Sequence, residues 1–124
     1  MATSEHAQKN HDELFPGHTS KLAMTDPELI EVFDNFAFDE VLQHGSLDPR
    51  TRLMVQLASM IASQALREYR IMLGAALIVG VTPVEAKEIV YQAVPYVGMA
   101  KVYDFLHATN EVLTHLLHHS FGSD

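Results

Sequence analysis

The sequence predicts an all-α fold, because apolar residues recur at helical spacing and no segment shows a strand pattern. Behind recognisable helix starts, apolar residues three and four positions apart run through residues 25–119. Nowhere do apolar and polar residues alternate convincingly with period two, as in a half-buried strand. With 48% hydrophobic and 19% charged residues, the 124-residue chain can bury one core. We therefore predict a single-domain helical bundle of five to six helices.

Two helices are predicted to begin with an aspartate followed by a proline. Asp26 and Pro27 precede an apolar stripe that ends at Gly45, and Asp48 and Pro49 start the next helix directly afterwards. The aspartates are expected to cap these helices. Proline suits the first helical position, where its missing N–H would be unpaired anyway.

The next segment, residues 53–65, is apolar on nearly every side. A helix without a polar face must be enclosed by other helices or by another subunit. The charged residues 67–70 break this apolar run, so a helix boundary is expected just before them. A further helix then extends from about residue 66 to Gly80.

Two more helices complete the predicted bundle. Thr82 and Glu85 have the spacing of a capping box, which starts a helix that residues 95–98 are expected to interrupt. The last helix carries an apolar seam over residues 102–117.

The polar N-terminal segment, residues 1–24, is predicted to be an arm that is ordered only if it packs on a neighbour. Leu14, Phe15 and Leu22 are its possible anchors. Residues 25–119 form the predicted helical domain, and residues 120–124 a C-terminal tail.

Composition excludes several functions. Eight Lys and Arg against sixteen Asp and Glu give a net charge of −8, which disfavours nucleic-acid or membrane-surface binding. The absence of cysteine removes disulfides and thiol chemistry. The longest uncharged stretches are shorter than the roughly 18–20 residues of a membrane span, and no signal peptide pattern opens the chain. We expect a soluble cytoplasmic protein.

The strongest polar cluster lies at the end of the most apolar segment and consists of Gln64, Arg67, Glu68, Tyr69 and Arg70. A carboxylate near two guanidiniums suits a general acid or base, with arginine available to hold an anionic substrate. The alternative is a solvated turn with an ion pair. Since all four arginines lie between residues 50 and 70, an anion pocket or pairing with acidic caps are both compatible with the pattern.

Histidines and methionines offer weaker candidates. His107 lies one turn after Tyr103 in the last helix, where a structural histidine is the alternative to a catalytic one. His115, His118 and His119 have metal-chelating spacing but equally suit a helix C-terminus, and we predict no metal and no other cofactor. The methionines, Met72 among them, suit either a core or a pocket for an apolar ligand.

Several strings resemble the γ-carboxymuconolactone decarboxylase family, whose superfamily includes the alkylhydroperoxidase D-like proteins. They are NFAFDEVL at residues 35–42, LDPRTR at 47–52, AALIVGVT at 75–82 with Glu85 to Val90, and QAVPYVGMA at 92–100. The resemblance covers about residues 30–115. It implies an all-helical fold whose subunits interlock into trimers or hexamers, and a cofactor-free decarboxylation of a lactone dicarboxylate in aromatic breakdown.

The functional residues carry over only in part. In the peroxidase-like branch a glutamate, two cysteines and a histidine form a proton relay, and these positions hold Leu53, Ala65, Glu68 and Met72 here. Thiol-dependent peroxide reduction is therefore excluded. The decarboxylase branch has a glutamate that Glu68 matches and a histidine that Met72 replaces. Tyr69, His107 or His44 could replace that proton donor.

The sequence thus favours a homo-oligomeric, decarboxylase-like protein that acts on a small carboxylated molecule. Glu68 would be the acid or base, Arg67 or Arg70 the carboxylate anchor, and Tyr69 and His107 supporting donors. Gln64, Met72 and Tyr103 would line the substrate site. One alternative is a binding module that kept the scaffold and lost the relay. Another is a protein whose buried helix serves assembly alone.

Overall fold

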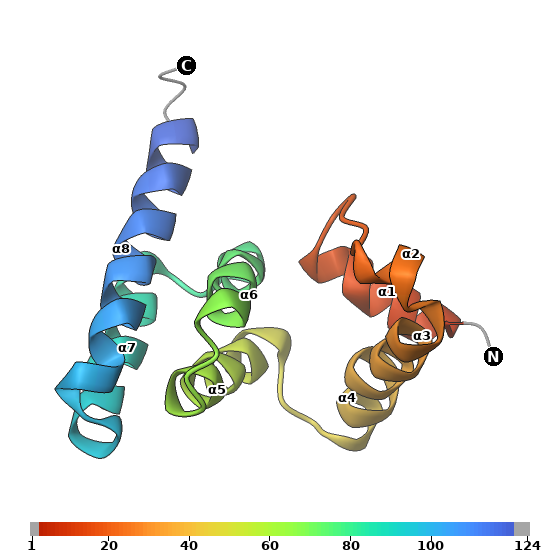
Figure 1. Cartoon of the computed structure of the whole chain (residues 1–124), viewed down its shortest axis with the longest axis horizontal. Helices are drawn as coiled ribbons and strands as arrows, with labels where there is room; N and C mark the ends of the chain where they lie inside the picture. Colours follow the sequence, from red (N-terminus) through yellow and green to blue (C-terminus); the bar gives the residue numbers. More distant parts are fainter. Residues whose placement is uncertain (1–2, 121–124) are drawn as a thin grey trace. The chain divides into compact units, whose positions relative to one another are not determined.

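The regular secondary structure of the part described by the structure, residues 3–120 of a computed structural model, is entirely helical. Figure 1 shows helices α1 to α8, and no strand occurs among these residues. The predicted all-α class is therefore confirmed. The helices group into two compact units, Met1–Leu47 and Asp48–Asp124, which are described separately.

The first unit consists of helix α1 and, after a turn, a rod of helical segments. Its elements are α1 (Glu5–Leu14), α2 (Leu22–Thr25), α3 (Pro27–Asn35), the π-helical segment η1 (Phe36–Glu40) and α4 (Val41–His44). The rod is continuous through α3, η1 and α4, because its joints keep right-handed helical backbone. α1 packs against α3 and η1, and the Asn10 amide donates to the carbonyl of Phe38 at 2.6 Å. The segment predicted as an arm thus contains a packed helix.

The expected cap at Asp26 is wrong. Its carboxylate makes no capping hydrogen bond and accepts one from the Thr25 hydroxyl at 2.8 Å. The reason is that α2 ends immediately before α3, so Asp26 belongs to both ends. Its backbone N–H closes α2 on the carbonyl of Leu22 at 2.7 Å.

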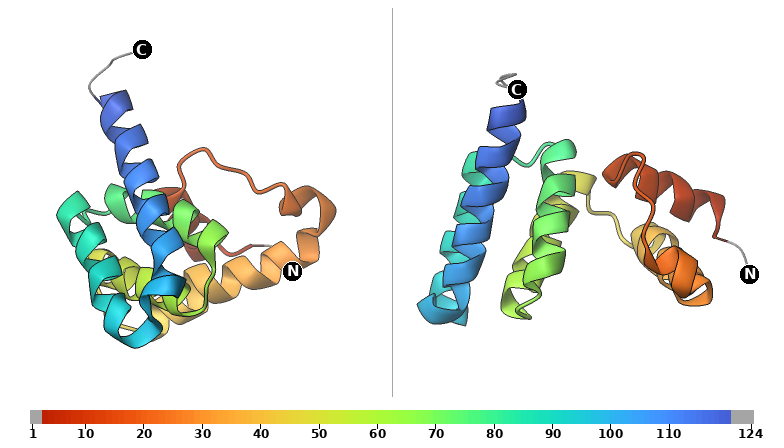
Figure 2. Two further views of the ribbon diagram at one scale, coloured as in Figure 1. Left: turned by 60° about the vertical axis from the view of Figure 1, so that its left-hand side comes forward. Right: turned by 45° about the horizontal axis from the view of Figure 1, so that its top comes forward.

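The second unit is a bundle of four helices: α5 (Pro49–Ala62), α6 (Leu66–Ile78), α7 (Pro83–Val97) and α8 (Met99–Ser120). α5 and α8 each pack against both α6 and α7, and Figure 2 gives two further views of these helices. The largest fully buried side chains come from all four helices and are Tyr69, Phe105, Leu53, Leu57, Ile61, Leu73, Val90, Val102 and Thr109. One stripe of α5 is therefore buried, whereas Val55 on the same helix stays exposed.

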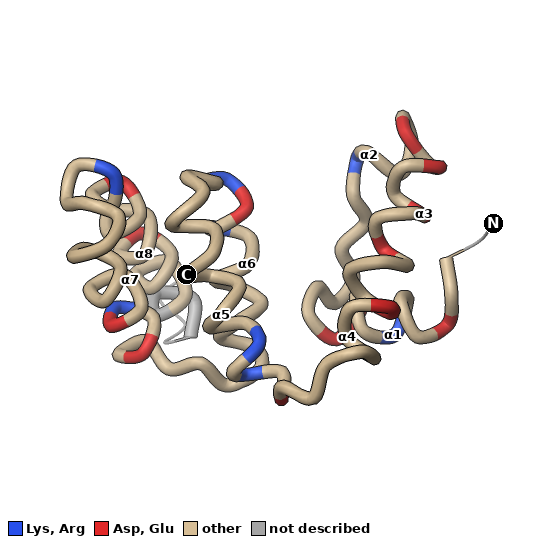
Figure 3. The backbone as a smooth tube through the Cα atoms, turned by 90° about the horizontal axis from the view of Figure 1, so that it is seen from below, with Lys and Arg blue, Asp and Glu red and all other residues tan. Residues whose placement is uncertain are grey.

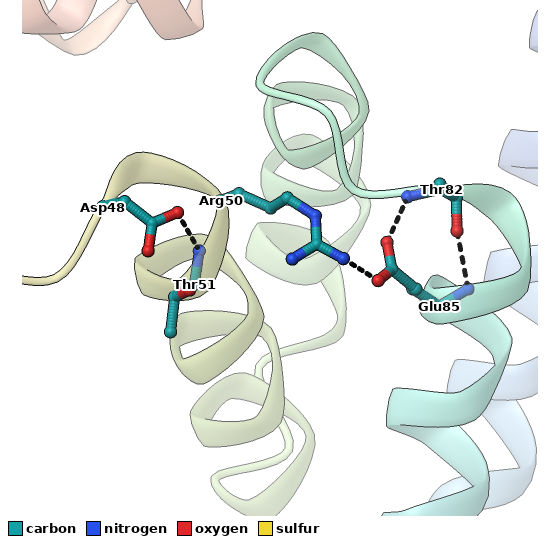
Figure 4. A network of polar contacts seen from close by, with 5 residues as sticks. All are labelled: Asp48, Arg50, Thr51, Thr82 and Glu85. Carbon is teal, nitrogen blue, oxygen red and sulfur yellow. Dashed lines mark hydrogen bonds and ion pairs between the residues drawn. The ribbon is translucent and has the colours of Figure 1, made fainter.

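Two predicted helix caps are confirmed and lie close together in Figure 4. Asp48 accepts a hydrogen bond from the N–H of Thr51 at 3.3 Å. Thr82 and Glu85 form the capping box, with reciprocal hydrogen bonds of 2.9 and 3.1 Å. Glu85 also pairs with Arg50, which joins the start of α5 to the start of α7. Pairing of an arginine with an acidic cap, one of the two alternatives above, thus occurs at Arg50.

The predicted interruption at residues 95–98 is placed too early in the chain, because α7 continues through Pro95 to Val97. A proline removes one hydrogen bond to the preceding turn. Pro95 lies in the last turn of α7, so few helical bonds depend on it. The helix ends instead at Gly98, whose φ of 102° is accessible to glycine.

The turn between α5 and α6 places Gln64 in the left-handed region. The N–H of Gln64 bonds the carbonyl of Ile61 at 3.1 Å, and that of Ala65 bonds Met60 at 2.9 Å, as in a Schellman motif. Gln64 has a φ of 64°, whereas the equivalent turn after α6 has Gly80 at 102°. A residue with a Cβ is strained in this region.

Replacing Gln64 by glycine is therefore expected to raise the free energy of unfolding by about 0.5–1 kcal/mol. Urea denaturation followed by circular dichroism measures the change. Gly80→Ala is the matched control and should lose about 1 kcal/mol or more, since alanine enters the same region. A loss at both positions would show that the Gln64 side chain stabilises the turn more than its backbone strains it.

Candidate functional site

The predicted polar cluster lies in the first turn of α6 and divides into an outward and an inward part. Arg67 and Glu68 are exposed, and neither side chain forms an ion pair or hydrogen bond with the described side chains, those of residues 3–116. Gln64 is exposed in the preceding turn, and its amide donates to the carbonyl of Ile61 at 2.8 Å. The outward part therefore offers one carboxylate and one guanidinium that remain available for a ligand.

Tyr69 points in the opposite direction, into the core. Its ring meets Phe105 edge to face at a centroid distance of 5.2 Å, and its hydroxyl lies 2.6 Å from Oγ1 of Thr109. Since Thr109 donates its only hydroxyl proton to the carbonyl of Phe105 at 2.7 Å, Tyr69 is the donor to Thr109. Burial raises the pKa of Tyr69. Tyr69 can thus affect the site by fixing the position of α6.

Arg70 and His107 are brought together by a residue that the sequence did not single out. Glu111 on α8 accepts from Nη2 of Arg70 at 2.8 Å, and the same carboxylate oxygen lies 3.4 Å from Nε2 of His107. The Arg70 hydrogen bond, its charge and the more distant His107 hold the pKa of Glu111 below its ordinary value. The spacing of His107 and Glu111, four residues apart on one helix, was the available signal.

The remaining candidates are more scattered. Tyr103 is exposed on α8, and Met72 is half-buried one turn after Glu68 on α6. Leu53 is fully buried in the core, and Ala65 directly precedes α6. Of the four relay positions, Glu68 is thus the one with an exposed polar side chain.

No group of three or more His, Asp or Glu side chains in the described residues could hold a metal ion. The side chains of His118 and His119 lie outside the described part of the chain, so the expectation that His115, His118 and His119 bind no metal stays a prediction. Over the same described residues, none of the helices is long and apolar enough to cross a membrane.

The comparison with known families is decisive for the scaffold. The sequence model of the carboxymuconolactone decarboxylase family matches residues 27–111. The chain belongs to this family. The match begins at the first residue of α3 and ends at Glu111, so it contains every proposed catalytic and substrate-binding residue of this carboxymuconolactone decarboxylase family member and leaves out α1 and α2. No curated protein matches the chain.

Proposed function

We propose that this protein catalyses a cofactor-free decarboxylation, or related acid–base chemistry, on a small carboxylated lactone-type substrate, as a cytoplasmic homo-oligomer. The observation that carries the proposal is the pair Arg67 and Glu68. By the resemblance described above, Glu68 matches the glutamate of the decarboxylase branch, and it lies beside a guanidinium that no described residue neutralises.

The two side chains suit the two demands of the reaction. A guanidinium can hold a substrate carboxylate through paired hydrogen bonds. Loss of CO2 breaks a C–C bond and leaves its electron pair on the substrate, where a carboxylic acid delivers the proton that completes the product. Arg67 is the better anchor of the two predicted arginines, because Arg70 already pairs with Glu111.

The other predicted residues receive supporting roles. Tyr69 acts as a positioning residue through Thr109. His107 is exposed, lies 3.4 Å from Oε1 of Glu111 and is an alternative proton donor on α8. Gln64, Met72 and Tyr103 remain proposed lining residues of the substrate site.

Decarboxylation of γ-carboxymuconolactone by the wild type and by Glu68→Gln tests the proposal. Removal of a general acid is expected to lower kcat by about 100-fold or more. Glu88→Gln, an exposed carboxylate on α7, is the control and should leave kcat unchanged. Equal rates for wild type and Glu68→Gln, or no turnover by either, would contradict the assignment.

A second candidate function is a binding module without catalysis. It is favoured by the apolar relay positions, since Leu53 is core and Met72 is half-buried next to Glu68. Native mass spectrometry should then find a retained apolar ligand. An empty protein with measured turnover would rule this candidate out.

A further inference from the structure

The rod of the first unit carries an exposed apolar face. Leu29, Val32, Phe33 and Phe36 recur at helical spacing along α3 and into η1, and each is between 54% and 60% exposed. Burial of one such side chain contributes about 1.5–3 kcal/mol. An amphipathic helix with a continuous stripe of this kind is a typical contact surface for another helix.

A second exposed stripe runs along α6. Arg67, Ile71, Gly74 and Ile78 succeed one another at spacings of three and four residues, with Ile71 47% and Ile78 57% exposed. A Cβ built on Gly74 would meet nothing within 4 Å, so no packing inside the described chain requires glycine there. Glycine inside a helix costs about 0.5–1 kcal/mol relative to alanine, and it permits close approach by another backbone.

The two stripes lie in parts of the chain that differ in net charge. Residues 1–47 carry nine acidic and two basic side chains, a net charge of −7, whereas residues 48–124 carry seven acidic and six basic ones, a net charge of −1. In Figure 3 blue and red segments are mixed on α5 to α8, whereas red segments predominate along α1 to α4. Two acidic rods would repel each other. The α6 stripe begins instead with the unpaired guanidinium of Arg67.

We propose that the α3–η1–α4 rod of one copy packs on the α6 stripe of a second copy. This inference rests on the homo-oligomer of the proposed function and not on its decarboxylation. The contact joins unlike surfaces, so successive copies associate head to tail, and the assembly closes into a ring when the rotation between copies permits. Because Glu68 neighbours Arg67 on α6, the docked rod also excludes water beside the candidate site, which strengthens electrostatic interactions there.

A mixing experiment tests this arrangement on the full-length chain. Phe33→Glu disrupts the rod and Ile71→Glu disrupts the α6 stripe, and each is expected to raise the dissociation constant about 100-fold or more. Each variant alone should sediment as a monomer in analytical ultracentrifugation. An equimolar mixture should regain dimers, because one undamaged rod can still pack on one undamaged α6 stripe.

Three controls complete the design. Both substituted side chains are about half exposed, and Phe33 has one edge-to-face ring contact, with Phe38, so circular dichroism should show retained helical folding. Val84→Glu places the same charge at an exposed apolar residue of α7 and should leave association unchanged. Gly74→Leu should weaken association more than Gly74→Ala does, since only close approach of a second helix penalises the larger side chain.

The possible outcomes separate this inference from the proposed function. A monomeric wild type would overturn both the homo-oligomer and the proposed contact. A wild-type oligomer whose variants fail to complement each other, or that Val84→Glu dissociates, would retain the assembly and overturn the assigned surfaces. Complementation without any decarboxylation would support the contact and contradict the enzymatic activity alone.

Discussion

Replacing Tyr69 by alanine is expected to lower the free energy of unfolding of the Asp48–Asp124 unit by about 3–5 kcal/mol, the usual cost of removing a buried aromatic ring. The ring is fully buried and packs edge to face on Phe105, so its loss leaves a cavity between α6 and α8. This is a large part of the roughly 5–15 kcal/mol that holds a typical domain folded. Thermal and urea unfolding measure the change.

Tyr69→Phe separates the ring from the hydroxyl and should cost only about 1 kcal/mol, because one hydrogen bond to Thr109 is lost. The two variants also differ from wild type in alkaline solution. Burial raises the pKa of Tyr69 above its ordinary value of 10.0. The contribution of the neutral Tyr69 side chain to the free energy of unfolding is therefore complete below pH 10.0 and is lost as the pH rises through the folded-state pKa. The phenylalanine variant should lack this alkaline loss. Equal stabilities of Tyr69→Ala and Tyr69→Phe would contradict the assigned packing.

Features set by neighbouring residues were predictable from the sequence. The caps at Asp48 and Thr82 were found because a side chain bonds an N–H three residues later, which is a purely local pattern. Asp26 has the same local pattern and fails, since the end of α2 competes for its backbone. The π-helical turn of η1 also has no simple sequence signature. Its Phe38 carbonyl accepts from Asn10 on α1, a contact between distant segments.

The sequence predicts which residues form the candidate site better than it predicts the direction in which each side chain points. The charged neighbours of Tyr69 favoured a solvent-exposed cluster, yet its helical phase places it with Leu73 and Ala76 on the buried side of α6. Glu111 escaped notice because its partner Arg70 lies 41 positions earlier in the chain. Long-range pairing depends on how α6 and α8 pack, and the spacing of one helix does not contain that information.

Substituting Met72 by histidine is expected to raise the rate of the proposed decarboxylation by about 100-fold or more, the contribution of one well-placed proton donor. Resemblance to the decarboxylase branch places a histidine at this position. Met72 lies one turn after Glu68 on α6, and residues four apart share a helix face. An imidazole there would add the second proton-transferring group next to the existing carboxylate, with no change required in the backbone.

Two further variants decide whether proton transfer explains such a gain. Met72→Gln adds a polar side chain of similar size that cannot exchange a proton, so it should leave the rate at the wild-type level. Adding Glu68→Gln to Met72→His should abolish the gain, because the carboxylate and the imidazole act together. The gained activity should also change over the titration range of an imidazole, near pH 6.5. Equal rates for the histidine and glutamine variants would show that Met72 does not occupy a proton-relay position, and the binding-module function would then be favoured.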